Sequence, residues 1–393
     1  MAQRSRMRSV PDEFPDEIPG KSEDTPDAQD LVIDLAAVDG PLVTPGFSPL
    51  ADFANFGEAE ALLLRDAGPD IGVFAKAIAG AMSAHIAKKL PRLDRELGME
   101  LGLEGAAADP GTIERWLFKS SIGPFDENFA DYVRELTHVD GGATFPGMNV
   151  ALPPQMLIGL MAWLEGQILL HLGDVSDTIT LSGVGAIWMD EMMLQLGIML
   201  EPVLENSPAG PRDYGGGHNA ELHPYAELAG FGMAEGRILG ETGSLLAPAA
   251  SGVISLAYSY LLSRPESAGF FQDSEHLAQR KQTLKAWWIR SAADPYETKG
   301  EFGDYLRKVA NAHVRGAGTH PEVEIPPQLT IALMGWVQMR VMTALNTIAL
   351  TPTGTASFGE LGDPEALATV GRAWMQMLTL QLGVLIDPYL STP

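Results

Sequence analysis

The feature that most constrains this chain is an internal repeat in its sequence. Residues 153–172 read PPQMLIGLMAWLEGQILLHL, and residues 326–345 read PPQLTIALMGWVQMRVMTAL. Aligned without a gap, eight of the twenty positions are identical, including the paired tryptophans Trp163 and Trp336. Self-similarity at a fixed offset is the signature of a repeated structural unit, so the fold of one copy is expected to occur twice.

Further matches extend the repeat in an unchanged order, relating 112–121 to 283–292, 129–132 to 302–305, and 194–204 to 380–390. Their offsets are 171, 173 and 186. The increase near the end places a 13-residue insertion (186 − 173) in the Thr-, Gly- and Pro-rich stretch 351–366. We therefore predict four parts: a disordered acidic, Pro-rich tail at 1–45, repeat 1 at 46–206, a Gly/Pro linker at 207–225 and repeat 2 at 226–393.

Each repeat is predicted to be almost entirely helical. Apolar residues recur at spacings of three and four, as at Leu157, Leu160, Met161 and Leu164. The Pro-Pro pairs at the start of both matched segments suit helix starts, because the first turn of a helix needs no N–H donor there. Alternating strand patterns are scarce, so the expected fold class is all-α.

The composition argues against several classes of function. With 26 basic against 51 acidic residues, the net charge of −25 argues against nucleic acid and anionic membrane as partners. The chain has no Cys, which excludes disulfides, zinc–thiolate sites, iron–sulfur clusters and cysteine nucleophiles. No apolar stretch follows the basic N-terminus, and Glu165 interrupts the apolar segment 156–172. We therefore expect a cytoplasmic protein without membrane insertion.

Repeat 2 contains an ordered set of motifs. From Leu256 it reads LAYSYLLSRPESAGFF, with a Tyr, two Leu, a Pro-Glu pair and a Phe before the next helix. A Leu-to-Thr helix (LAQRKQT) follows, then an aromatic-acidic turn (FGDY), an apolar pair, a His (VANAH) and Pro before a long helix. No single motif is specific, but the ordered set is fairly specific and covers most of 240–393. In this set repeat 2 resembles the sensor-globin and protoglobin family.

This resemblance implies a globin-like helical bundle that holds haem b, one per chain, in repeat 2. By position, His313 would be the proximal ligand of the haem iron. Tyr258 would be the distal Tyr, whose hydroxyl donates a hydrogen bond to a bound gas. The residues expected to contact the porphyrin are Phe271, Leu277, Leu284, Trp287, Val309 and Ile325. A haem site does need an axial imidazole, an apolar slot and a distal donor.

Repeat 1 departs from the pattern at both key positions. Offset 173 places Asp140 where His313 lies, and offset 174 places Ala84 where Tyr258 lies. A carboxylate is a poor replacement for an axial imidazole, so repeat 1 is predicted to be a globin-like domain without ordinary haem ligation. A misplaced local gap would instead let His138 serve as a ligand.

Other arrangements of polar residues are weak. There is no HExxH, P-loop or GxSxG motif, and no residue is assigned to catalysis. The acidic pairs Asp126-Glu127 and Asp190-Glu191 are interpreted as solvated helix ends or faces.

In sensor globins the last two long helices often form the dimer contact, and here the matching helices occur twice in one chain. We predict an intramolecular pseudo-dimer through the helices at 153–172, 186–204, 326–345 and 370–390. The leading hypothesis is a haem protein that binds a diatomic gas, O2 first and NO or CO next, and signals through a separate protein. Two alternatives stay open: a cofactor-free globin-fold interaction scaffold, and a haem enzyme acting on NO or peroxide.

Overall fold

The computed structural model describes residues 41–44, 46–48, 51–54, 56–205, 222–269, 274–293, 301–311, 325–350 and 359–390. All of them belong to one compact unit, Pro41–Pro393. Within these residues the secondary structure is helical, apart from one isolated bridge and one antiparallel hairpin of β1 (His138–Val139) and β2 (Gly142–Ala143). The predicted all-α class is therefore confirmed.

The N-terminal half, residues 41–205, contains α1 (Ala51–Ala54), α2 (Glu58–Leu97), α3 (Pro110–Ile122), α4 (Glu127–Thr137), α5 (Pro154–Val175) and α6 (Thr178–Leu204). The C-terminal half, residues 222–390, contains α7 (Leu222–Leu228), α8 (Met233–Leu246), α9 (Ala250–Ser263), α10 (Pro265–Ala268), α11 (Ser274–Ala293), α12 (Glu301–Asn311), α13 (Pro327–Leu350) and α14 (Pro364–Ile386), with 3-10 turns η5 (Gly359–Gly362) and η6 (Asp387–Tyr389). The four helices predicted from the repeat are α5, α6, α13 and α14.

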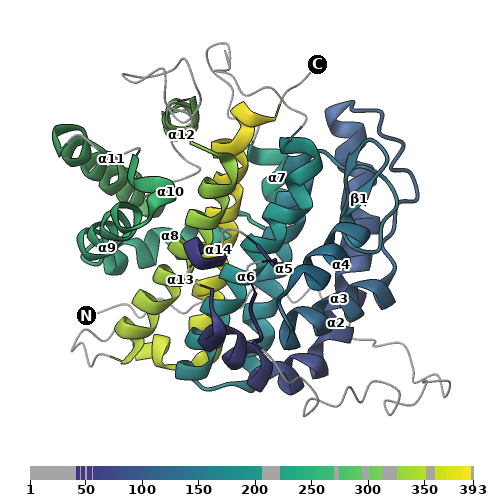
Figure 1. Ribbon diagram of the computed structural model, residues 1–393, viewed down its shortest axis with the longest axis horizontal. Coiled ribbons are helices and arrows are strands. Elements are labelled where there is room, and N and C mark those ends of the chain that lie inside the picture. The colour runs from purple at the N-terminus through teal and green to yellow at the C-terminus, as the bar shows by residue number, and fades with distance from the viewer. Residues whose placement is uncertain are drawn as a thin grey trace, which may run out of the picture. The chain divides into compact units, whose positions relative to one another are not determined.

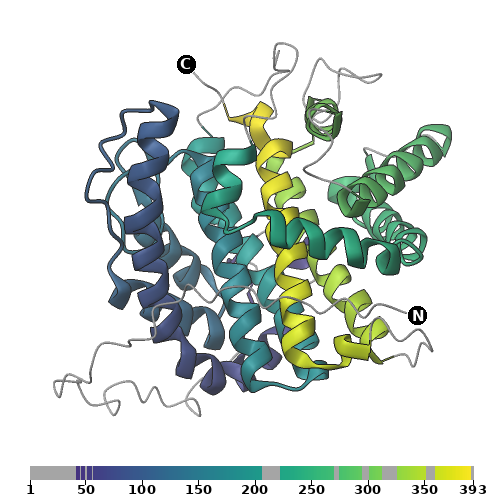
Figure 2. The ribbon, with the colours of Figure 1, turned by 180° about the vertical axis from the view of Figure 1, so that it is seen from behind.

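These four long helices lie at the centre of the unit (Figure 1). Helix α5 packs along α14, and α6 packs along α13, so each helix of one half has its main long partner in the other half. Helices α2, α3 and α4 lie on one side of the four and α9 and α11 on the other, while α8 crosses α14 (Figure 2). The contact between the halves thus uses the last two long helices of each, as expected.

The contacts between the halves are reciprocal. A Cβ added to Gly197 on α6 would lie 4.0 Å from Ile331 of α13, and a Cβ added to Gly383 on α14 would lie 3.7 Å from Ile158 of α5. The two glycines are 186 residues apart and the two isoleucines 173 apart, the offsets of the sequence matches. In a two-fold interface, residue i of one copy contacts residue j of the other and the reverse, so the halves meet with pseudo-two-fold symmetry.

One pair of matched residues makes direct contact and marks the pseudo-two-fold axis. Gln338 Nε2 donates to Glu165 Oε2 at 3.3 Å, and these residues are 173 apart. The Thr379 hydroxyl donates to the same Glu165 oxygen at 2.6 Å and accepts from Gln338 at 2.7 Å. A residue can touch its own copy only at the axis, so here the halves face each other with different side chains.

The two halves share a further sequence match, which the sequence analysis missed. Residues 51–64 read ADFANFGEAEALLL and residues 226–239 read AELAGFGMAEGRIL, with seven identities at an offset of 175. Both segments start a helix in the same way. The Gly57 N–H donates to Glu60 at 3.1 Å, and the Gly232 N–H donates to Glu235 at 2.9 Å. A carboxylate three residues into a helix satisfies a donor that would otherwise lack a partner.

Two stacked pairs, whose members match at offsets of 175 and 173, are each tied to a backbone carbonyl of the opposite half. The two sets are His85, Trp163 and Leu228, and Tyr260, Trp336 and Phe53. The ring centroids of His85 and Trp163 lie 4.6 Å apart, and those of Tyr260 and Trp336 lie 5.9 Å apart. The short helix at the start of each half therefore packs on the long helices of the other half.

The halves differ most in their first long helix. In the N-terminal half α2 runs unbroken for 40 residues, but the corresponding α8 and α9 are separated and meet at 81°. Pro248 lies in the break and corresponds at offset 175 to Val73 within α2. Proline lacks the N–H that a helix interior needs and clashes with the preceding turn. The bend directs α9 away from the four central helices, toward α11 (Figure 1).

The ordered fold begins earlier than the predicted tail boundary at residue 45. Leu42 is 1% exposed, its carbonyl accepts from Phe125 N, and the Thr44 N–H donates to Phe125 O at 2.9 Å. Residues 1–40 lie outside the described part of the chain. The sequence analysis placed 41–44 in the tail because residues 1–45 hold many Pro and acidic residues and few large apolar ones before Leu31, and it missed that Leu42 is buried.

The close approach of α5 to α14 gives a test of this packing. A Cβ at Gly173 would lie 2.6 Å from the Ala368 Cβ, whereas one at the exposed Gly183 on α6 meets nothing within 4 Å. We expect Gly173→Val to lower the free energy of unfolding by about 1–3 kcal/mol, as overpacking does. Gly183→Val is the matched control and should change it by less than about 0.5 kcal/mol in urea unfolding. Equal effects would contradict the helix contact.

Candidate functional site

Helix α9 presents one apolar face that includes Tyr258. The buried positions Ile254, Ala257, Tyr258 and Leu261 follow helical spacing. Tyr258 is 6% exposed, and the Lys281 ammonium on α11 lies 5.8 Å from its ring centre. Burial raises the pKa of Tyr258 to about 12, so its hydroxyl keeps its proton at neutral pH. A buried, protonated phenol is the chemistry expected of a distal donor.

Helix α12 is fastened to α11 through Tyr305. The Tyr305 hydroxyl donates to the Thr283 carbonyl at 2.7 Å, and the Arg290 guanidinium lies 5.1 Å from the ring centre. In the N-terminal half Lys119 lies 3.8 Å over Tyr132, which occupies the matched position on α4. Both halves therefore share this contact. In the C-terminal half it fixes the position of α12 relative to α11, and with it the point from which the chain continues after α12.

The predicted haem contacts that the structure describes lie on three elements. Leu277 and Leu284 are half-buried on α11, Val309 is half-buried on α12, and Ile325 is half-buried just before α13. His313 and Phe271, the proposed axial ligand and porphyrin contact, lie outside the described residues, so their positions stay predictions. His313 follows the end of α12 at Asn311 by two residues.

Trp287 is held in a hydrogen-bonded group with α14. Its indole N–H donates to Gln381 Oε1 at 2.5 Å, and Gln381 Nε2 lies 3.1 Å from Ser291 Oγ. The N-terminal half contains the same group, in which the Trp116 indole donates to Gln195 at 2.5 Å and Gln195 donates to Ser120 at 2.9 Å. Trp287 therefore connects α11 to a helix of the central four.

Two cationic side chains of α11, Arg280 and Lys281, act on Tyr258. In sequence, α11 and α12 also contain three acidic residues, Glu275, Glu301 and Asp304. The same helices carry six cationic side chains: Arg280, Lys281, Lys285, Arg290, Arg307 and Lys308. The sequence analysis did not single them out, although the run of cations in 280–290 was a readable signal. Local positive charge favours an anionic ligand.

A haem fits these residues on the criteria that the described atoms allow. The porphyrin is apolar with two propionate groups, and α11 carries half-buried Leu side chains together with Lys281 and Arg280, which lie near the buried phenol of Tyr258. Among the described residues no group of three or more His, Asp or Glu side chains could hold a bare metal ion.

The corresponding region of the N-terminal half is filled by protein. Offset 175 makes Ser83, not Ala84, the counterpart of Tyr258, and its hydroxyl donates to the Ala108 carbonyl at 2.6 Å. Ile113 and Leu152, which match Leu284 and Ile325, are 0% and 4% exposed. With either offset, 174 or 175, the N-terminal half has no tyrosine at the position that corresponds to Tyr258.

The two alternative axial positions of the N-terminal half lie at the hairpin. The His138 ring contacts the Ile198 carbonyl at 2.9 Å through Nε2. A carbonyl only accepts, so this nitrogen carries the proton and is engaged within the protein. Asp140 is exposed at the turn between β1 and β2.

The N-terminal half places three carboxyl groups in the core of the interface. Glu165, Asp190 and Glu191 are at most 1% exposed. Their counterparts in the C-terminal half carry no charge: Gln338, Gln376 and Met377. Desolvation by burial raises the pKa of Glu165 to about 8, against the donations of Thr379 and Gln338. This side chain therefore titrates near physiological pH.

The interpretation of Asp190-Glu191 as a solvated pair was wrong, whereas Asp126-Glu127 does lie at the start of α4. Burial raises the pKa of Asp190 well above its usual range; the Glu60 charge adds to this and Arg340 opposes it. Burial raises that of Glu191 too, while its hydrogen bond from Gln195 opposes the shift. Their apolar neighbours within α6 were the signal that they face inward.

Helix α5 is the only single helix of the described residues that is long and apolar enough to cross a membrane, and 83% of its apolar window is buried inside the protein. Helices α8 and α9 reach the same threshold only as a bent pair. Burial of this kind is expected for a core helix of the four-helix contact.

Comparison with known proteins gives one match. The protoglobin family model matches residues 218–393, which span α7 to α14 and contain Tyr258, the cationic helices and His313. No curated protein and no solved structure matches the chain. The C-terminal half of this chain, residues 218–393, is a protoglobin-family domain.

Proposed function

We propose that the C-terminal half binds one haem b and, through it, a diatomic gas, and that the protein is a cytoplasmic sensor acting on a separate partner. The observation that carries this proposal is the site around Tyr258. The buried, protonated phenol of Tyr258 lies near Lys281 and Arg280 of α11, and the same helix carries the half-buried Leu277 and Leu284. The protoglobin family match supports haem and a gas as ligands.

Each residue has a distinct part in this proposal. His313 would hold the iron on one side, and Tyr258 would donate a hydrogen bond to a ligand on the other. Phe271, Leu277, Leu284, Val309 and Ile325 would exclude water, and Trp287 would fix α11 against α14. Haem supplies a ferrous iron that binds O2, NO or CO. The cations of α11 would neutralise the propionates.

We further propose that the chain is a tandem duplication in which the N-terminal half serves as the internal partner. The reciprocal glycine contacts, the shared Trp–Gln–Ser groups and the matched N-caps support this origin. A change at α11 would pass through Trp287 and Gln381 to α14, which packs on α5. The filled core of the N-terminal half favours a cofactor-free scaffold role for that half.

Haemin titration tests the proposal directly. We expect a saturable Soret band at one haem per full-length chain, with ferrous and carbon monoxide spectra typical of a single axial imidazole. Absence of specific uptake would refute the haem proposal and leave the cofactor-free scaffold as the better account.

Tyr258→Phe tests the distal role. The phenylalanine keeps the ring and removes the donor, so haem uptake should be unchanged while O2 dissociation accelerates by about tenfold, the equivalent of one hydrogen bond of 1–1.5 kcal/mol. Stopped-flow measurement of O2 release provides the comparison. Tyr260→Phe, two residues away and bonded to the Phe53 carbonyl, is the matched control and should leave the rate unchanged. Equal rates in the wild type and Tyr258→Phe would contradict the assignment.

A further inference from the structure

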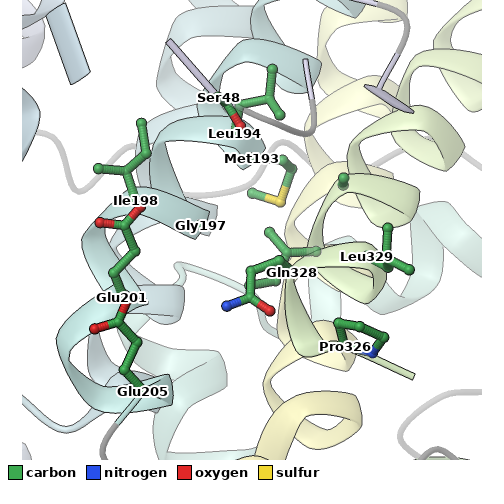
Figure 3. Close-up of a pocket in the computed structure, with 12 residues that line it drawn as sticks. Ser48, Met193, Leu194, Gly197, Ile198, Glu201, Glu205, Pro326, Gln328 and Leu329 are labelled. Atoms are coloured by element: carbon green, nitrogen blue, oxygen red, sulfur yellow. The ribbon is translucent and has the colours of Figure 1, made fainter. Parts of the chain in front are cut away.

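A cavity of about 420 Å³ lies between α6 of the N-terminal half and α13 of the C-terminal half (Figure 3). Its apolar wall is formed by Met193, Leu194, Ile198, Leu329, Ile331 and Ala332. Gly197 leaves its helix surface open there, since an added Cβ would lie 4.0 Å from the nearest side chain, Ile331. The cavity is separate from the elements that carry Tyr258.

The pseudo-symmetric position on the other side of the interface is bridged. Between α5 and the end of α14, the Gln155 amide donates to Asp387 at 3.1 Å. The matched residues at the cavity are Gln328 and Glu201, which form no such bond. Both Glu201 oxygens accept from Arg134 on α4 instead, at 2.8 and 3.2 Å. The two sides of the interface therefore differ in whether the matched glutamine and acid are hydrogen-bonded to each other.

The lining indicates which molecules would bind. Gln328 has no hydrogen-bond partner among the described residues, and its amide projects into the space near Met193 (Figure 3). A primary amide both donates and accepts, so it suits a neutral hydroxyl or amide group. Glu201 and Glu205 line the same cavity and disfavour an anionic group. The volume is near the lower end of the range of about 300–1,000 Å³ for ligand pockets, which suits roughly ten non-hydrogen atoms.

We propose that this cavity binds a small neutral amphiphile, an alkyl chain whose hydroxyl or amide end hydrogen-bonds to Gln328. The alkyl chain would lie against the apolar side chains of α6 and α13, each buried methylene contributing about 0.8 kcal/mol. The ligand would contact both halves at once, and therefore stabilise their packing against each other.

Calorimetric titration of the full-length chain with 1-octanol tests this assignment. We expect one site for wild type and at least tenfold weaker binding for Gly197→Leu, which fills the cavity from α6. Gly183→Leu adds the same side chain to the same helix at an exposed position and is expected to bind as wild type does. Unchanged binding in Gly197→Leu, or none in wild type, would overturn the proposal.

Two further arms identify the chemistry and guard against misfolding of Gly197→Leu. Octanoate has the same chain with an anionic end and should bind at least tenfold more weakly than 1-octanol. Gln328→Glu changes a half-buried side chain near the helix start and should weaken 1-octanol binding by a similar factor. Octanoate binding as tightly as 1-octanol, or full affinity in Gln328→Glu, would refute the neutral-ligand assignment.

Discussion

Replacing His313 with Ala is expected to abolish the Soret band of the haemin-reconstituted chain. The imidazole is the one axial ligand that the protoglobin resemblance supplies, and loss of a metal–ligand bond should weaken haem binding by orders of magnitude. Asp140→Ala, at the matched position of the N-terminal half, should leave the spectrum and the stoichiometry unchanged. Absorption spectra of oxidised, reduced and carbon monoxide forms give the comparison.

Other outcomes of this experiment point to other residues. Two haems per chain, one of them surviving His313→Ala, would mean that the N-terminal half also ligates iron and that His138 leaves its contact with the Ile198 carbonyl. An unchanged band in His313→Ala would contradict the assignment of the axial ligand. His320, seven residues further along the chain, would then be the next residue to replace.

Glu165→Gln is expected to remove much of the pH dependence of stability between about pH 4.5 and 8. The pKa of Glu165 is raised from 4.5 to about 8 in the folded protein. Between these two pKa values Glu165 is protonated in the folded state and ionised in the unfolded state. The free energy of unfolding therefore falls as pH rises, by up to about 1.4 kcal/mol per pH unit. Above pH 8 both states are ionised, and this contribution no longer changes.

Glutamine reproduces the shape of protonated glutamate and cannot ionise, so the gain in stability should be largest above pH 8, on the order of several kcal/mol. Urea unfolding from pH 5 to 9 measures the slopes. Asp190 and Glu191 leave a residual slope of the same sign, since their pKa values are also raised by burial. Glu96→Gln removes an exposed carboxylate paired with Arg92 and is the control. Parallel slopes in wild type and Glu165→Gln would contradict a buried, protonated Glu165.

The central helices and the helices they pack against could be predicted because the same helix pattern occurs in both repeats of the sequence. Matching apolar periodicity around Trp163 and Trp336 located the central helices to within a few residues, apart from the starts of α6 and α14, where the matched segments began later than the helices. The break at Pro248 could not be placed, because α2 continues through Pro69 and Pro91 without a break. Whether proline ends a helix depends on tertiary packing, which the local sequence does not specify.

The candidate site was only partly predictable. The resemblance supplied Tyr258 and His313, whose roles stay predictions; the structure adds that Tyr258 is buried and that burial raises its pKa. The burial of Asp190 and Glu191 was missed because charged residues rarely lie in a core, and only three-dimensional packing shows that α6 is enclosed on all sides. The hydrogen bond from Trp287 to Gln381 was also missed, since 94 residues separate the partners.

The covalent link between the halves makes their association independent of dilution. Two separate chains joined through such helices would part at low concentration, whereas here the linker sets a constant effective concentration. Each half packs against the other half of the same chain, whose sequence differs from its own. A substitution at one position is therefore not repeated at the symmetry-related position, as it would be in a homodimer. A homodimer would place glutamate against glutamate at the position of Glu165, and this chain places glutamate against Gln338. The single chain thereby holds an acid–amide contact that symmetry forbids to a dimer of identical subunits.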